Sequence, residues 1–132
     1  MAVPSRRGRW AVTHAPPCVT RSAWPPLRCW PHHFDIGTLL HMANGTVGLG
    51  FSVGDEEIPE PYWYVRAHPA PGGDPAPGVL PFGEWHLVGW HAAILRASQV
   101  NGLPSGDARL HRATRFLDAA VAANGTLLLL PR

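Results

Sequence analysis

The sequence predicts an α+β fold, in which a hairpin-led antiparallel sheet of about four strands carries one C-terminal helix. Three observations indicate this class. An Asn-Gly pair separates two segments of alternating apolar character at residues 34–54. Aromatic and β-branched residues concentrate at 61–68, and apolar residues at helical spacing follow Ser105. At 132 residues, the chain is long enough for one hydrophobic core.

The N-terminal segment differs from the rest. Residues 1–28 contain five arginines, five prolines and no acidic residue. We expect residues 1–26 to be a disordered tail or a spurious segment, from a missed start or a shifted frame, with an RNA-binding arm as a further alternative. Residues 27–132 then form a single domain. The residues after 28 contain six arginines and nine carboxylates, which gives this part of the chain a net negative charge. No nucleic-acid partner is therefore expected for 27–132.

The first hairpin is predicted to turn at Asn44-Gly45, because both central residues of a type I′ turn need positive φ. This turn pairs residue i with residue 89 − i. One face, which includes Leu40 and Val47, then forms the core. The other face carries Gly37, Gly48 and Gly50, a floor with few side chains. Glycine within a strand is typical of close approach by a ligand or another backbone, so this floor either binds a ligand or receives another strand or the helix.

The two later strands, the loop between them and the C-terminal helix are predicted from the residue types in each segment. Residues 61–68 are predicted to be the third strand, 69–83 a proline-glycine loop, and 84–98 the fourth strand. A helix is capped by Ser105 or Asp107 and extends to about Ala123, where Asn124-Gly125 is the expected C-cap. Its apolar face comprises Leu110, Ala113, Phe116, Leu117, Ala120 and Val121.

A divalent metal site is the first functional hypothesis. His33 and Asp35 lie two residues apart, about 6.6 Å along a strand and on the same face, which suits a pair of ligands. Glu57, in the acidic turn at 55–57, and His86 could complete the site. Imidazole with carboxylates suits Fe(II), Mn(II) or Zn(II), but no established motif supports the site. In the alternative, His33 bonds Asp35 or backbone and the turn is solvated.

A second hypothesis comes from six aromatic residues, Trp30, Tyr62, Trp63, Tyr64, Trp85 and Trp90. If some of them line the glycine floor, they form a cleft for a flat or sugar-like small molecule, with Gly48, Gly50, Trp63 and Trp85 as binding residues. In the alternative, the aromatic side chains fill the core between sheet and helix.

The segments WPHHFDIGTLL, VGLGFSVGD and EPYWYV, with EWHLVGW and RFLDAAVAA after them, resemble an uncharacterised bacterial group, domain-of-unknown-function family 5996. The resemblance covers about residues 27–123. Glu84 stands where the family has a histidine. The family's members are longer at the N-terminus, which implies that 27–132 corresponds to the C-terminal half of a longer domain. It implies no activity.

The function predicted is therefore a non-catalytic or small-ligand-binding domain without a cofactor, and the alternative is a metal-dependent enzyme. The longest apolar run, Leu127–Leu130, is far below the roughly 18 residues that span a membrane. We expect a soluble, cytoplasmic bacterial protein that has no membrane partner.

Overall fold

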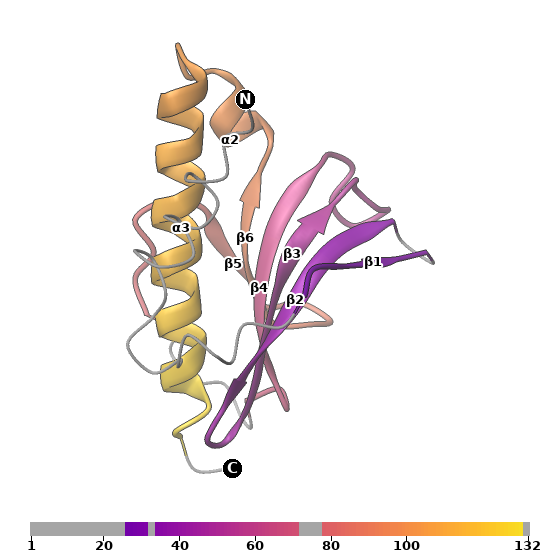
Figure 1. Cartoon of the computed structure of the whole chain (residues 1–132), viewed down its shortest axis with the longest axis vertical. Helices are drawn as coiled ribbons and strands as arrows, with labels where there is room; N and C mark the ends of the chain where they lie inside the picture. The colour runs from indigo at the N-terminus through magenta and orange to yellow at the C-terminus, as the bar shows by residue number, and fades with distance from the viewer. Residues whose placement is uncertain (1–25, 32–33, 72–77, 131–132) are drawn as a thin grey trace.

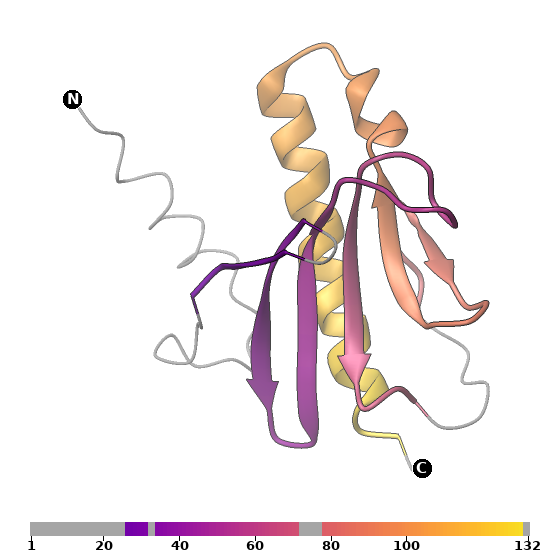
Figure 2. The same cartoon turned by 90° about the vertical axis from the view of Figure 1, so that its right-hand side faces the viewer.

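One antiparallel sheet organises the molecule. In the computed structural model, which describes residues 26–31, 34–71 and 78–130, six strands form the order β1-β2-β3-β4-β6-β5. The strands are β1 (Arg28–Trp30), β2 (Asp35–Met42), β3 (Gly45–Ser52), β4 (Tyr62–His68), β5 (Glu84–His86) and β6 (Ala92–Arg96). A short helix, α2 (Ser98–Asn101), leads to the long helix α3 (Gly106–Leu127). Helix α3 covers one face of the sheet, and no helix of the described residues lies on the other face (Figures 1 and 2).

The main core lies between α3 and the sheet. Phe116 is fully buried there, and burying such a side chain stabilises the fold by about 1.5–3 kcal/mol. The strands contribute side chains from alternate positions, as a sheet with one covered face requires. The buried residues of this cluster are Leu40, Val47, Leu49, Val65, Ala67, Ala93, Leu95, Val100, Ala113, Phe116, Ala120, Val121 and Leu128.

A second, smaller cluster lies on the open face. Ile58, Tyr62, Ala92 and Ile94 are buried there, with Tyr64 and Trp90 partly buried against them. Ile58 belongs to the loop between β3 and β4, so this loop folds back over the end of the sheet. The open face is therefore only partly bare.

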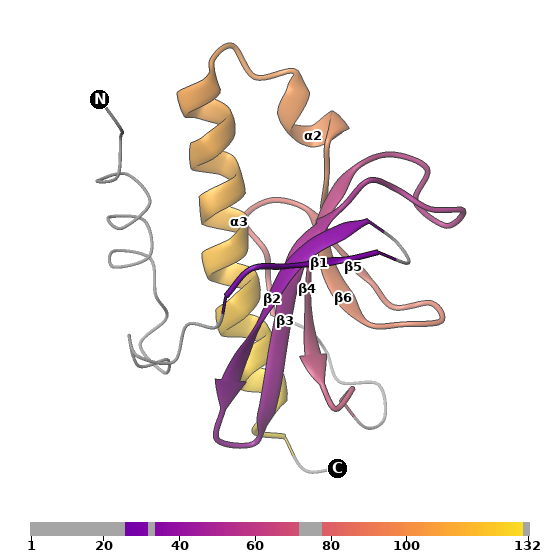
Figure 3. The same ribbon diagram turned by 45° about the vertical axis from the view of Figure 1, so that its right-hand side comes forward.

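The α+β class is confirmed, but the prediction of about four strands is wrong. The segment 84–98 forms two strands and the start of α2, because residues 87–91 connect β5 to β6 and Gly89 has φ +82°. Strand β1 was also missed. Its three residues are exposed and pair with β2, so no apolar alternation marks them. Figure 3 shows β1 beside β2 at the edge of the sheet, at a steep angle to β3 and β4.

The predicted hairpin register is wrong by two residues. Met42 pairs with Gly45 and Leu40 with Val47, so Ala43 and Asn44 form the turn. Phe34 is the single non-glycine residue with positive φ among those described, which excludes a type I′ turn at Asn44. Gly45 is needed in the strand instead, because a Cβ there would lie 2.2 Å from the carbonyl oxygen of His68. A two-residue shift preserves the faces, so the glycines still share the open face.

Helix α3 begins as predicted and ends later. The Ser105 side chain caps it by accepting from the Ala108 N–H at 3.1 Å. The expected end at Asn124-Gly125 is wrong, since the helix continues to Leu127. The buried Asn124 side chain donates to the carbonyls of Ala120 (2.8 Å) and Val65 (3.3 Å), which ties this turn to β4. Leu110, predicted in the core, is 57% exposed because it precedes the part of α3 that meets the sheet.

Most of the predicted tail, residues 1–25, lies outside the described residues. No helix in the described part of the chain is long and apolar enough to cross a membrane.

Candidate functional site

The open face of the sheet is shaped by one tyrosine lying on two glycines. Gly37 pairs with Gly50, and Gly50 pairs with Tyr64, so the three residues form one row across the strands. A Cβ on Gly50 would lie 2.7 Å from the Tyr64 hydroxyl, and one on Gly37 would lie 3.2 Å from it. The glycines therefore make room for the Tyr64 ring, which extends across β3 to β2. Among the residues that the structure describes, neither another strand nor the helix occupies this floor.

The next row places an arginine on the same face. Gly48 pairs with Leu39 on one side and Arg66 on the other. A Cβ on Gly48 would touch Leu39 Cδ2 at 3.3 Å and Arg66 Cγ at 3.8 Å. The guanidinium of Arg66 lies 5.8 Å from the ring centroid of Trp90, within the range of a cation–π interaction.

The loop after β3 is held by Asp55. Its Oδ1 accepts the backbone N–H groups of Glu57 and Ile58, both at 2.9 Å, and its Oδ2 accepts the Tyr62 hydroxyl at 2.6 Å. Burial raises the pKa of Asp55, but these three hydrogen bonds together lower it below its ordinary value. The loop is therefore anchored to the sheet by an ionised carboxylate at neutral pH.

A second contact joins this loop to the β5–β6 connection. Trp90 Nε1 donates to Glu57 Oε2 at 2.9 Å, and His86 Nε2 lies 3.1 Å from the same oxygen without hydrogen-bond geometry. The His86 and Trp90 rings are 4.8 Å apart between centroids. Glu57, Trp90 and His86 thus form one side of the open face.

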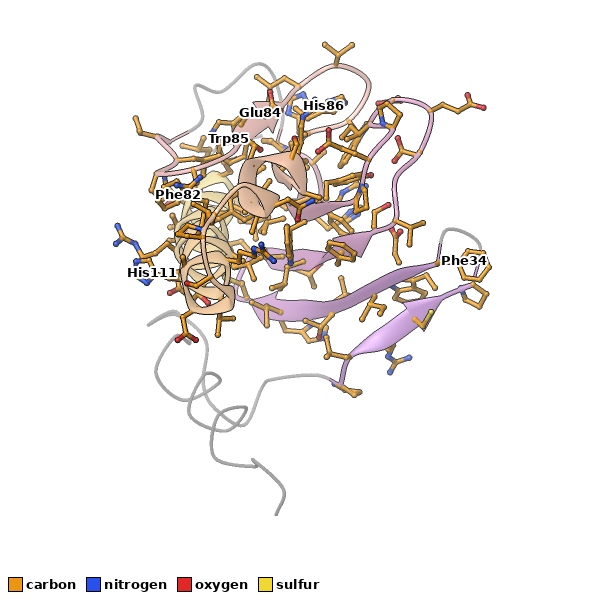
Figure 4. All side chains as sticks on the ribbon, turned by 90° about the horizontal axis from the view of Figure 1, so that it is seen from above. Phe34, Phe82, Glu84, Trp85, His86 and His111 are labelled. Carbon is orange, nitrogen blue, oxygen red and sulfur yellow. The ribbon has the colours of Figure 1, made fainter. Side chains whose placement is uncertain are left out.

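Between these groups lies an open cleft of about 790 Å³. Aromatic and charged side chains dominate its lining. The aromatic ones are Trp30, Phe34, Tyr62, Tyr64 and Trp90, and the charged ones are Asp35, Asp55, Glu56, Glu57 and Arg66, with His68 beside them. Figure 4 shows Phe34 toward the β1–β2 edge of the sheet and His86 toward the β5 edge. The cleft is large enough for a small organic molecule.

Two polar atoms of the cleft residues are buried and lack hydrogen-bond partners in the described part of the chain. They are Asp35 Oδ1, an acceptor, and Arg66 Nε, a donor. Neither residue forms an ion pair with another described side chain. A buried polar atom without a partner costs about 1–3 kcal/mol, so neither atom stabilises the free protein in this arrangement.

Tyr64 lies between these two charges. Burial and the nearby Asp35 carboxylate raise the pKa of Tyr64 to about 12, and Arg66 opposes them. Burial and the hydrogen bond to Asp55 also raise the pKa of Tyr62. Both tyrosines therefore keep their protons at neutral pH and present hydroxyl groups near the floor of the cleft.

The predicted ligand residues do not come together. Gly48 lines the cleft and Gly50 lies beneath Tyr64, but Trp63 and Trp85 pack against the main core on the helix face. Trp85 pairs with Ala93 and its Nε1 donates to the Gly78 carbonyl at 2.7 Å. Figure 4 shows Trp85 toward the helix and His86 away from it. Placing these two tryptophans on the glycine floor was wrong, because their strand positions alternate with those of the open face.

The predicted metal ligands are only partly assembled. Asp35 and Glu57 both line the cleft, and His86 contacts Glu57. His33 lies outside the described residues. Within the described ranges, no three histidine, cysteine, aspartate or glutamate side chains are grouped closely enough to hold a metal ion.

The sequence prediction considered Tyr62, Tyr64 and Trp90 as cleft aromatics but did not select them as binding residues, and it did not consider Arg66. The alternation in YWYVRAH was a usable signal, since it places positions 62, 64 and 66 on one face. The pairing of β4 with β3 decides whether this is the open face or the helix face, and the sequence does not specify that pairing.

Comparison of the chain with protein-family models, with curated proteins and with solved structures finds no match. The resemblance to family 5996 therefore stays a prediction, and the functional argument rests on the cleft.

Proposed function

We propose that this domain binds a small organic molecule in the cleft on the open face of the sheet. The observation that carries the proposal is the pair of buried, unpartnered atoms Asp35 Oδ1 and Arg66 Nε in residues that line one cleft. A ligand with a donor and an acceptor would satisfy both atoms and offset their desolvation.

The rest of the lining supports this interpretation. Ligand sites are mostly apolar concave surfaces with a few placed polar groups, and here five aromatic side chains line the same cleft as Asp35 and Arg66. The floor is also held in place, because Tyr64 packs on Gly37 and Gly50 and Asp55 anchors the adjoining loop. Such a preformed surface loses little conformational entropy when a ligand binds.

The proposal is tested by protein-observed NMR on the isotopically labelled 132-residue chain. A fragment library of amines, sugars, nucleosides, amino acids and carboxylates serves as the probe. We expect at least one fragment class to shift the amide signals of Gly48, Tyr64 and Arg66 in a saturable manner. A library that shifts no signals, or shifts only those of the helix face, would overturn the proposal.

Two exposed leucines provide a matched control. Leu39 lines the cleft, whereas Leu110 lies on α3 away from it. Leu39→Ala should weaken binding of the fragment several-fold, because an apolar contact is lost, and Leu110→Ala should leave it unchanged. Equal effects would show that the fragment does not bind in the cleft.

A metal-dependent enzyme is the second candidate, favoured by the 3.1 Å approach of His86 to Glu57. In this case, the chain purified without an affinity tag should contain close to one transition metal per molecule. Metal analysis by mass spectrometry should show that His86→Ala and Asp35→Ala each lower this content. Metal-free, folded protein that takes up no Zn(II) or Mn(II) would contradict the candidate.

A further inference from the structure

The charges around the cleft are unbalanced. Asp35, Asp55, Glu56 and Glu57 line it, and Arg66 is the one arginine among the lining residues. His68 adds a positive charge only when protonated. The cleft therefore has an excess of negative charge at neutral pH, although the whole chain has a formal net charge of +2.

The negative charge is concentrated at one end. Asp35 begins β2, in line with Ser52 and Tyr62, and Asp55 bonds Tyr62 directly. The Cα of Arg66 lies four residues beyond that of Tyr62 along β4, about 13 Å away along the strand direction, and its guanidinium lies beside the Trp90 ring. At the Asp35 end no described arginine neutralises the carboxylates, and Asp35 Oδ1 has no donor.

The walls at this end are aromatic. Trp30, Tyr62 and Tyr64 line the cleft with Asp35. Aromatic faces attract cations through their ring quadrupole, and the Arg66–Trp90 contact already shows such an arrangement within the cleft. Carboxylates with aromatic rings form an environment that favours an ammonium group over a neutral or anionic one.

We propose that the ligand of this cleft is an organic cation, whose ammonium group binds at the Asp35 end between the aromatic side chains and whose acceptor group faces Arg66. This inference rests on the proposed function, since it names the chemical class that the same cleft would accept. A hydrated metal ion would gain little from the aromatic walls, whereas an alkylammonium group would contact both walls and carboxylate.

Three probes of similar shape test the charge preference: 2-phenylethylamine, 2-phenylethanol and 3-phenylpropionate. Each is titrated into the full chain at neutral pH and low salt, and its dissociation constant is taken from NMR shifts. We expect the amine to bind at least about tenfold more tightly than the alcohol, and the propionate to bind most weakly. Raising the salt concentration should narrow the difference, because the cleft is open to solvent.

Asp35→Asn is the decisive variant. It should weaken amine binding about tenfold and leave alcohol binding almost unchanged, which also shows that the variant is folded. Asp107→Asn removes the same charge from the first turn of α3, outside the cleft, and should leave all three affinities unchanged.

The outcomes separate the two proposals. If the alcohol or the propionate binds in the cleft as tightly as the amine, the cation preference is overturned and the binding function stands. If Asp35→Asn weakens all three probes equally, the role of its charge is overturned. If no probe binds in the cleft while library fragments of another class do, the cation preference also fails; if no fragment binds, both proposals fail.

Discussion

Tyr64 determines the depth of the open face, because its ring lies over the backbone of Gly37 and Gly50. A methyl group at position 50 would collide with the Ile36 carbonyl oxygen at 2.6 Å and with the Tyr64 hydroxyl at 2.7 Å. Because the Ile36 oxygen belongs to the backbone, a side-chain rotation cannot relieve this collision, and strand β2 would have to shift. Small residues here are therefore a packing requirement of the cleft floor.

Gly50→Ala should lower the free energy of unfolding by about 1–3 kcal/mol, because it overpacks this row. Urea denaturation followed by far-ultraviolet circular dichroism measures the change. Gly102→Ala is the control, since nothing lies within 4 Å of a Cβ there and the backbone has φ −73°. Equal losses in both variants would show that Tyr64 does not pack on Gly50.

Asp55 gives the fold a pH dependence with a definite sign. Its folded-state pKa is below the ordinary 3.8, despite burial, because it accepts hydrogen bonds from Tyr62, Ile58 and Glu57. A lowered pKa stabilises the folded state above pH 3.8, and this contribution is lost as the pH falls through the folded-state value.

Asp55→Ala removes three hydrogen bonds, so we expect it to reduce the free energy of unfolding at neutral pH. Because solvent exposure weakens these hydrogen bonds, the reduction should be only about 1–2 kcal/mol. The difference from the parent protein should shrink steadily as the pH falls below 3.8. Denaturation curves at several pH values provide the measurement. A difference that is constant with pH would mean that the ionised carboxylate does not hold the loop.

Among the elements, α3 shows how a buried polar side chain extends a helix. An Asn-Gly pair normally favours a helix end, but Asn124 bonds to Ala120 and Val65, and Gly125 lies against Met42 Sδ at 3.4 Å. These contacts stabilise the last turn of the helix more than the Asn-Gly pair favours ending it. The last turn of α3 is therefore held by the sheet.

Asn124→Asp should destabilise the protein by at least about 2 kcal/mol, since it replaces a buried donor with an acceptor that faces two carbonyl groups. Asn101→Asp, in the exposed last position of α2, should change stability by less than about 0.5 kcal/mol. Thermal unfolding by calorimetry compares the two. Similar small effects would contradict a structural role for the Asn124 amide.

The elements also show what the sequence could predict. Strand β4 and the start of α3 follow from β-branched and aromatic residues and from the Ser105 cap, which are local signals. The hairpin register and the end of α3 depend on His68 and Val65, partners distant in sequence. The sequence identified the glycine face correctly because a register error of two residues does not change which residues share a face. The face on which the β4 aromatic residues lie could not be predicted, because it depends on how β4 pairs with β3.

Across the whole molecule, stability and binding make different demands on the same residues. Asp35 and Arg66 each have a buried atom without a partner, which costs stability in the free protein. Natural sites commonly retain such costs for function. The main core on the helix face supplies the stability that permits them.

Asp35→Asn should therefore leave the free protein as stable as the parent, within about 0.5 kcal/mol, or slightly more stable, because it removes one of the cleft's crowded negative charges. Differential scanning calorimetry at neutral pH measures this. A loss of more than about 1 kcal/mol would show that Asp35 is a structural residue.

The position at which 2-phenylethylamine binds to the chain shows whether the cleft on the open face is a ligand site. Assigned NMR spectra of the full chain, recorded during titration, show which backbone amides move. We expect saturable shifts at Gly48, Tyr64, Arg66 and Trp90, with none at Trp85, Phe116 or Ala120. Shifts confined to the helix face, or none at any residue of the open face, would contradict a site for organic cations here, and would contradict any ligand site in this cleft if the fragment library also shifts none of these residues.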